Sequence, residues 1–88
     1  YQRVLHRYLD RMAAQVKAVA PTAVLDAGCG EGYVYRGLRA RGVHARWHGV
    51  DLSDGAVAFA AARSPEARWS TVDLRRIPVP DRYADLVL

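Results

Sequence analysis

Three aspartates hold equivalent places in the sequence and could bind one ligand together. Asp26, Asp51 and Asp73 each stand at the end of a short, mainly apolar run of residues. A carboxylate there can accept hydrogen bonds from ribose hydroxyls, an exocyclic amine or an ammonium group, and such charge-assisted bonds are about twice as strong as neutral ones. The three acids therefore predict a site for a ligand with hydroxyl or nitrogen donors.

A glycine-rich segment follows the first of these acids. Gly28, Gly30 and Gly32 can adopt positive φ at little cost and let a ligand approach the main chain without meeting a Cβ. The helix that opens after them presents free N–H groups. Such a pattern is weak alone, but its place directly after an apolar run, with Asp51 nineteen residues beyond Gly32, strongly favours a nucleotide-like ligand.

The glycine segment departs from the fingerprint of dinucleotide-binding proteins. That fingerprint requires a third small residue where this sequence has Tyr33. Glu31, at the start of the helix, would also repel a pyrophosphate. An NAD-linked oxidoreductase is therefore disfavoured but stays an alternative, as does a nucleotide-binding module without catalytic activity.

Each aspartate also has a structural alternative. Asp26 and Asp51 could cap the helices that follow their strands. Asp73 could form a surface ion pair with Arg75 or Arg76. The combination of the first two acids with the glycines favours ligand binding for that pair.

Apolar periodicity predicts the elements that must position these residues. From Arg3 to Val19 apolar residues recur at helical spacing, which predicts an amphipathic helix whose Tyr8, Leu9 and Met12 pack on a sheet. Short apolar runs then alternate with helical patterns, and Ser53 is a suitable N-cap. Strands are expected over residues 23–27, 46–51, 67–72 and 84–88, and helices over residues 31–41 and 53–63.

This alternation implies a Rossmann-like α/β fold, a parallel sheet with flanking helices. The expected division is an N-terminal amphipathic helix over residues 1–20 and a ligand-binding unit over residues 21–88. Because so small a sheet leaves a strand edge unpaired and one helical layer thin, we expect the chain to form the N-terminal half of a larger domain, to end in its fourth strand and to be inactive alone.

Composition narrows the class of protein. The 88 residues suffice for one domain, no apolar run is long enough to cross a membrane, and the cytoplasm is the expected location. The single cysteine excludes an intrachain disulfide and a cysteine-built zinc site, and no metal is expected. The net charge of +4 rests on scattered arginines, which favours solvated side chains over a nucleic-acid surface. Structural roles are expected for Cys29, His6, His44, His48, Trp47, Trp69 and Asp85.

Several segments resemble the motifs of the class I S-adenosylmethionine-dependent methyltransferases. Residues 24–33 are similar to the first motif of that family and residues 49–53 to its second-strand motif. Residues 72–74, 77–81 and 83–87 resemble its third- and fourth-strand segment, so the match extends over residues 23–88. The resemblance implies S-adenosyl-L-methionine as cofactor and methyl transfer as activity.

The resemblance also implies roles at the methionine end of that cofactor. Asp26 would hold the methionine ammonium through water. Gly28 and Gly30 would form the floor under the methionine and the ribose, and Tyr33 would cover the methionine end.

At the nucleoside end, the resemblance implies that Asp51 takes the two ribose hydroxyls and that Leu52 packs on the adenine. Asp73 would accept a hydrogen bond from the adenine amine, and the backbone N–H of Leu74 would reach an adenine ring nitrogen. In this family the acceptor-binding residues mostly follow the fourth strand, so no catalytic residue is assigned.

The methyl acceptor stays open between a small molecule and RNA. Residues 30–33, 49–53 and 77–81 are also similar to the ribosomal RNA guanine N1-methyltransferases. Those proteins carry an N-terminal zinc-binding segment, and nothing before Ala23 resembles one. The methyl acceptor is therefore not assigned. The sequence does not indicate an oligomeric state either.

Overall fold

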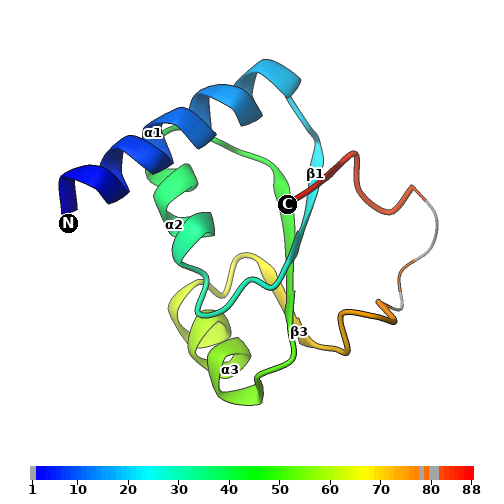
Figure 1. Cartoon of the computed structure of the whole chain (residues 1–88). Coiled ribbons are helices and arrows are strands. Elements are labelled where there is room, and N and C mark those ends of the chain that lie inside the picture. Colours follow the sequence, from blue (N-terminus) through cyan, green and yellow to red (C-terminus); the bar gives the residue numbers. More distant parts are fainter. Residues whose placement is uncertain (1, 78, 80–81) are drawn as a thin grey trace.

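The computed structural model describes residues 2–77, 79 and 82–88 (Figure 1). Pro78, Pro80 and Asp81, which belong to the family-like segment over residues 77–81, lie outside the described residues. The elements follow in the order α1 (Gln2–Val19), β1 (Ala23–Ala27), α2 (Tyr33–Ala40), β2 (Arg46–Asp51), α3 (Asp54–Arg63), β3 (Arg68–Thr71) and β4 (Leu86–Val87).

The four strands form one parallel sheet in the order β3-β2-β1-β4. β1 lies between β2 and β4, and four of its five residues are buried, which explains its unbroken apolar run. The register pairs Asp26 with Gly49, so β1 and β2 end close together. The predicted Rossmann-like parallel sheet with flanking helices is confirmed.

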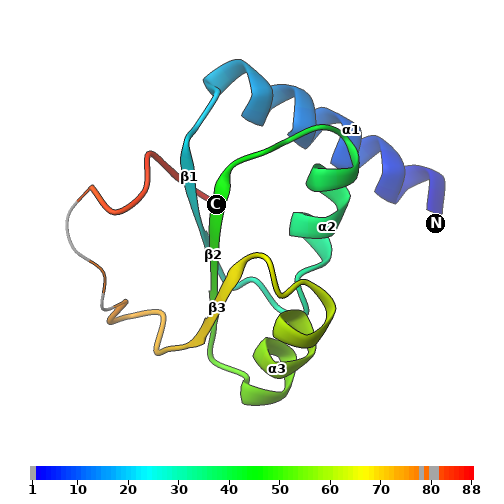
Figure 2. The ribbon, with the colours of Figure 1, turned by 180° about the vertical axis from the view of Figure 1, so that it is seen from behind.

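The two faces of the sheet are covered differently. All three helices lie on one side, and the described parts of the segment between β3 and β4, residues 72–77 and 82–85, lie on the other side (Figures 1 and 2). The core lies between the helices and the sheet, and its buried members are Ala13, Val16, Val24, Tyr35, Leu38, Val43 and Trp47. Within the described residues no helix is long and apolar enough to cross a membrane.

α1 packs through a narrower stripe than the sequence suggested. Leu9 is buried, but the side chain of Tyr8 is 52% exposed, so the prediction that Tyr8 packs on the sheet is wrong. Successive helical residues point about 100° apart, so with Leu9 facing the core Tyr8 lies at the border of the buried stripe. Leu9 also lies directly over α2, because a Cβ added to Gly37 would come within 2.7 Å of a Leu9 methyl carbon.

The two later helices begin at well-defined turns. α2 starts at Tyr33 rather than at residue 31 because Gly32 adopts a left-handed conformation with φ of 83°. Before α3, the Ser53 hydroxyl oxygen accepts a hydrogen bond of 3.2 Å from the N–H of Ala56, so the predicted N-cap is confirmed.

Asp85 joins the last strand to the first. Its carboxylate accepts hydrogen bonds from the N–H groups of Thr22 and Ala23, at 3.0 and 2.8 Å. These backbone donors, Thr22 first, hold the pKa of Asp85 below its usual range. The expected structural role of Asp85 is confirmed.

Candidate functional site

The glycine loop, residues 28–32, turns over the carboxyl end of β2. The N–H groups of Gly28 and Cys29 both donate to the carbonyl oxygen of Val50, at 2.8 and 3.0 Å. Gly28 and Gly30 have φ of 78° and 55°, which L side chains rarely adopt. A Cβ on Gly30 would meet no atom within 4 Å, so the main chain there borders open space that a ligand can enter.

Asp51 connects this loop to the turn before α3. One carboxylate oxygen accepts the N–H of Gly30 and the other the N–H of Ser53, both at 2.9 Å. These backbone donors, Ser53 first and Gly30 second, hold the pKa of Asp51 below its ordinary value, so the group is ionised. Each carboxylate oxygen has two lone-pair directions, so both retain one for ligand hydroxyls.

Asp26 has the opposite electrostatic character. Its side chain is 7% exposed, and its Oδ2 atom has no hydrogen-bond partner among the described residues. Burial raises the pKa of Asp26 to about 6, the nearby Trp47 indole opposes that rise, and the charge of Asp51 adds to it. The indole and the carboxyl do not make a hydrogen bond of standard geometry. A buried carboxylate without a partner is suited to a cationic group such as an ammonium.

We expect the Asp26→Asn variant to be more stable than the wild type at pH 8. The folded-state pKa of about 6 exceeds the ordinary value of 3.8, so the Asp26 contribution to stability is complete below about pH 4 and is lost as the pH rises through 6. Asparagine removes that cost, worth roughly 3 kcal/mol at pH 8. Thermal unfolding at pH 8 and pH 5 measures it, and an equal gain at both values would contradict the argument.

Apolar side chains surround the open part of the loop. Leu52, directly after Asp51, is 71% exposed, and Tyr33 and Leu74 are also exposed. A methyl carbon of Leu74 lies 3.9 Å from where a Cβ on Gly28 would be, so the segment after β3 reaches the loop. These surfaces fit a flat apolar ring such as adenine, and together with the acceptor carboxylates of Asp26 and Asp51 they fit S-adenosylmethionine.

Asp73 lies just beyond β3, but another residue engages its carboxylate. Arg75 donates to it through its backbone N–H, Nε and Nη2, at 3.0, 3.1 and 2.9 Å. The Arg75 side chain, 88% exposed, forms a surface ion pair of little energetic weight. The surface ion pair that the sequence offered as the alternative role of Asp73 is thus formed, with Arg75. A hydrogen-bond donor on a ligand would share the carboxylate with Arg75.

Cys29 is a packing residue. Its thiol is buried, and burial first, then the charges of Asp26 and Asp51, raise its pKa to about 12. The thiol therefore stays protonated at neutral pH, where it is a poor nucleophile. Among the described residues no group of histidine, cysteine and acidic side chains could hold a metal ion.

An aromatic cluster of Tyr35, Trp47 and Trp69 lies beneath the site. The Tyr35 ring packs edge-on against both tryptophans, with centroids 5.3 and 5.5 Å apart. A Cβ on Gly49 would overlap the Trp69 ring, and one on Gly32 would lie 3.0 Å from it. The sequence predicted that both tryptophans are core residues, but it did not predict that Trp69 supports the loop. Gly49 was the available signal, because a glycine inside a strand often marks a place where another group packs closely against the backbone.

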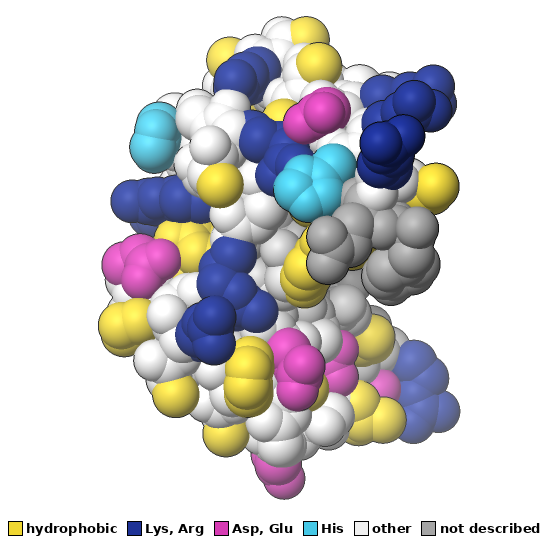
Figure 3. All heavy atoms as spheres, turned by 90° about the vertical axis from the view of Figure 1, so that its left-hand side faces the viewer, with side chains coloured by type: hydrophobic (Ala, Val, Ile, Leu, Met, Phe, Trp, Pro, Cys, Tyr) yellow, Lys and Arg dark blue, Asp and Glu magenta, His cyan; other side chains and the backbone are white. Residues whose placement is uncertain are grey.

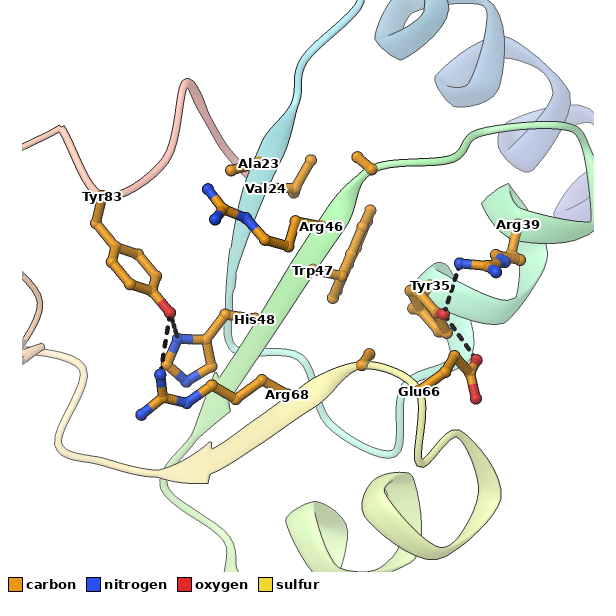
Figure 4. A pocket seen from close by; sticks show the side chains of 12 residues that line it. Ala23, Val24, Tyr35, Arg39, Arg46, Trp47, His48, Glu66, Arg68 and Tyr83 are labelled. Carbon is orange, nitrogen blue, oxygen red and sulfur yellow. Dashed lines mark hydrogen bonds between the residues drawn. The ribbon is translucent and has the colours of Figure 1, made fainter.

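A cavity of about 380 Å³ lies at the end of the sheet opposite the glycine loop, by the amino ends of β1, β2 and β3 (Figure 4). Its polar groups bond mainly to one another: the Tyr35 hydroxyl donates to Glu66 at 2.7 Å, and the Tyr83 hydroxyl lies 2.9 Å from Nδ1 of His48. Burial, followed by the charge of Arg68, lowers the pKa of His48, so this histidine is a neutral structural group as expected. None of the predicted site residues lines this cavity.

Comparison with known proteins agrees with this geometry. Residues 24–88 match the methyltransferase domain family. A malonyl-[acyl-carrier protein] O-methyltransferase from Halorhodospira halophila is 36% identical over 98% of the chain and 30% of its own length. A putative 23S rRNA (guanine-N(1)-)-methyltransferase from Bacillus subtilis is 34% identical over 74% of the chain and 24% of its own length. The chain thus spans less than a third of the curated relatives it matches.

Among solved structures, a TehB-like SAM-dependent methyltransferase from Corynebacterium glutamicum is 34% identical. It superposes with a TM-score of 0.69 over 85% of this chain and 41% of its own. The matched residues 24–88 include the glycine loop and both strand-end acids. The chain therefore belongs to the methyltransferase domain family, as a class I S-adenosylmethionine-dependent member.

Proposed function

We propose that this chain provides the cofactor-binding part of an S-adenosylmethionine-dependent methyltransferase that works in the cytoplasm. Residues 21–88 bind the cofactor, and the N-terminal segment, residues 1–20, contributes α1 to the helical layer on one side of the sheet. The observation that carries the proposal is the buried, unpartnered oxygen of Asp26 beside an open glycine loop. When bound, the cofactor supplies a methyl group on a positively charged sulfur, so the protein's task is to bind, orient and exclude water.

At the methionine end, the ionised Asp26 receives the ammonium group, directly or through water. Gly28 and Gly30 offer bare main chain as the floor, since their conformations and the open space at Gly30 permit close approach. Tyr33, exposed at the start of α2, covers this end of the site.

At the nucleoside end, Asp51 accepts the ribose hydroxyls through its remaining lone pairs. The exposed Leu52 packs on the adenine and loses contact with water when it does so. Asp73 and the backbone N–H of Leu74 receive the edge of the ring, with Arg75 sharing the Asp73 carboxylate.

The acceptor is a small or carrier-borne molecule on this proposal, with RNA as the second candidate. The names of the relatives at 36% and 34% identity specify a malonyl group on a carrier protein and a ribosomal guanine. On the face shown in Figure 3, acidic and hydrophobic side chains interrupt the basic ones. Phosphate-backbone binding calls for a continuous basic surface, so this face does not favour RNA.

Calorimetry with the full-length protein tests the cofactor. We expect S-adenosylmethionine and S-adenosylhomocysteine to bind at least tenfold more tightly than NAD, because the site offers carboxylates to an ammonium and to hydroxyls, and Glu31 in the glycine loop would repel a pyrophosphate. Tighter binding of NAD would show that the chain serves a different class of enzyme.

A further inference from the structure

Two buried polar atoms without partners lie on the same side of the sheet. Among the described residues, Oδ2 of Asp26 and Nε1 of Trp47 are the buried side-chain atoms that make no hydrogen bond. The register pairs Trp47 with Val24 and Asp26 with Gly49, so the indole and the carboxyl are diagonal neighbours on the helix-covered face. Gly49 has no side chain to separate them.

We propose that Trp47 is a positioning residue for Asp26: the nearby indole N–H stabilises the ionised form of the carboxyl that receives the cationic end of the ligand. The inference rests on the proposed function, because the ligand's ammonium is what the carboxylate receives. A phenylalanine at this position would fill similar space without burying a donor. The indole N–H therefore carries a burial cost that only an acceptor nearby can offset.

The surroundings of Asp26 leave the indole as the stabilising group. Burial and the charge of Asp51, at the end of β2, both disfavour the carboxylate, and Trp47 is the group that opposes them. Cys29 from the glycine loop and Tyr35 from α2 have pKa values raised to about 12, so both are neutral near pH 6.

A cation on α2, Arg36, is engaged elsewhere. Its guanidinium donates to the carbonyl oxygen of Glu31 at 2.8 Å and contacts the Ser64 hydroxyl at 3.5 Å. The causes of the raised Asp26 pKa include no charged group from α3 or β4.

The Trp47→Phe variant removes the donor and keeps an aromatic ring. S-adenosylhomocysteine affinity of the full-length protein, measured from pH 5 to pH 8.5, should fall in the wild type as the pH drops through about 6. In Trp47→Phe the midpoint should move to higher pH while affinity at pH 8.5 is kept. A midpoint one unit higher lowers affinity at pH 6 about fivefold.

Trp69→Phe is the matched control. Its indole N–H donates to the Ser64 carbonyl oxygen at 2.8 Å, and its ring also packs on Tyr35. This variant should keep the wild-type midpoint. An unchanged midpoint in Trp47→Phe, or the same shift in both variants, would overturn the inference.

A carboxyl-carbon NMR titration of Asp26 without ligand separates this inference from the proposed function. If no S-adenosylhomocysteine binds at any pH, the proposed function fails, whereas the titration still shows whether Trp47→Phe raises the Asp26 midpoint.

A second variant is available if Trp47→Phe does not fold. Benzothienylalanine at position 47, in the Trp69→Phe background, replaces the indole N–H by sulfur at nearly constant size. An unmoved titration there overturns the inference.

Discussion

Replacing Asp51 with alanine is expected to weaken S-adenosylhomocysteine binding at least tenfold and to lower the free energy of unfolding by about 2 kcal/mol. The affinity falls because the ribose hydroxyls lose a charged acceptor in a partly dry site. Stability falls because the N–H groups of Gly30 and Ser53 lose their 2.9 Å partners. Calorimetry and thermal unfolding of the same variant measure the two effects.

Two further variants separate the roles of Asp51. Asp51→Asn keeps an acceptor for one backbone N–H and should recover part of the stability but little of the affinity. Asp54→Ala removes an exposed acid from the first turn of α3 and should leave affinity within about twofold, because an exposed charge there contributes only modestly. A lowered melting temperature with unchanged affinity in Asp51→Ala would show that the residue only holds the two loops together and does not bind the cofactor.

Replacing Gly49 with alanine is expected to destabilise the protein by about 3 kcal/mol. The added Cβ would overlap the Trp69 ring and lie 2.9 Å from the Cβ of Cys29. The ring cannot move away freely, because Tyr35 packs against it and its N–H is bound to the Ser64 carbonyl. Urea unfolding measures the loss.

The same change at Gly55 is the control. A Cβ there would meet only the Ser53 hydroxyl, at 4.0 Å, so Gly55→Ala should be neutral or stabilising by up to about 1 kcal/mol. Trimming the obstacle, as in Gly49→Ala combined with Trp69→Leu, should cost less than the sum of the two single changes. Simple additivity would show that the ring is not the cause.

The central strands could be predicted to the residue, whereas the edge strands could not. β1 and β2 are central parallel strands, each with four buried residues, and each ends at or next to the aspartate that marks its end in the sequence. At the edges fewer neighbours fix the ends, so β3 covers residues 68–71 of the predicted 67–72. β4 covers residues 86–87 of the predicted 84–88, and the flanking backbone still bonds to β1: the N–H of Asp85 donates to the carbonyl oxygen of Ala23 at 3.1 Å and that of Leu88 to Leu25 at 2.9 Å.

At the site, the sequence predicted what strand ends and loops determine. Asp26, Asp51 and the glycine loop meet because parallel strands end at one edge of the sheet. The ion pair of Asp73 with Arg75 is one of the two roles that the sequence left open for this acid, and side-chain rotamers decide it. The closeness of Trp47 to Asp26 depends on strand register, which no local pattern encodes.

The placement of the aromatic cluster has an optical consequence. The chain contains two tryptophans, and both pack on Tyr35; the Trp69 ring lies against Gly32 of the glycine loop, and Trp47 lies near Asp26. The ultraviolet emission of this segment therefore originates almost entirely at the base of the site, where Trp47 adjoins a carboxyl group whose charge changes near pH 6. Its native fluorescence is a label-free reporter of events in the loop above, without any dye or added chromophore.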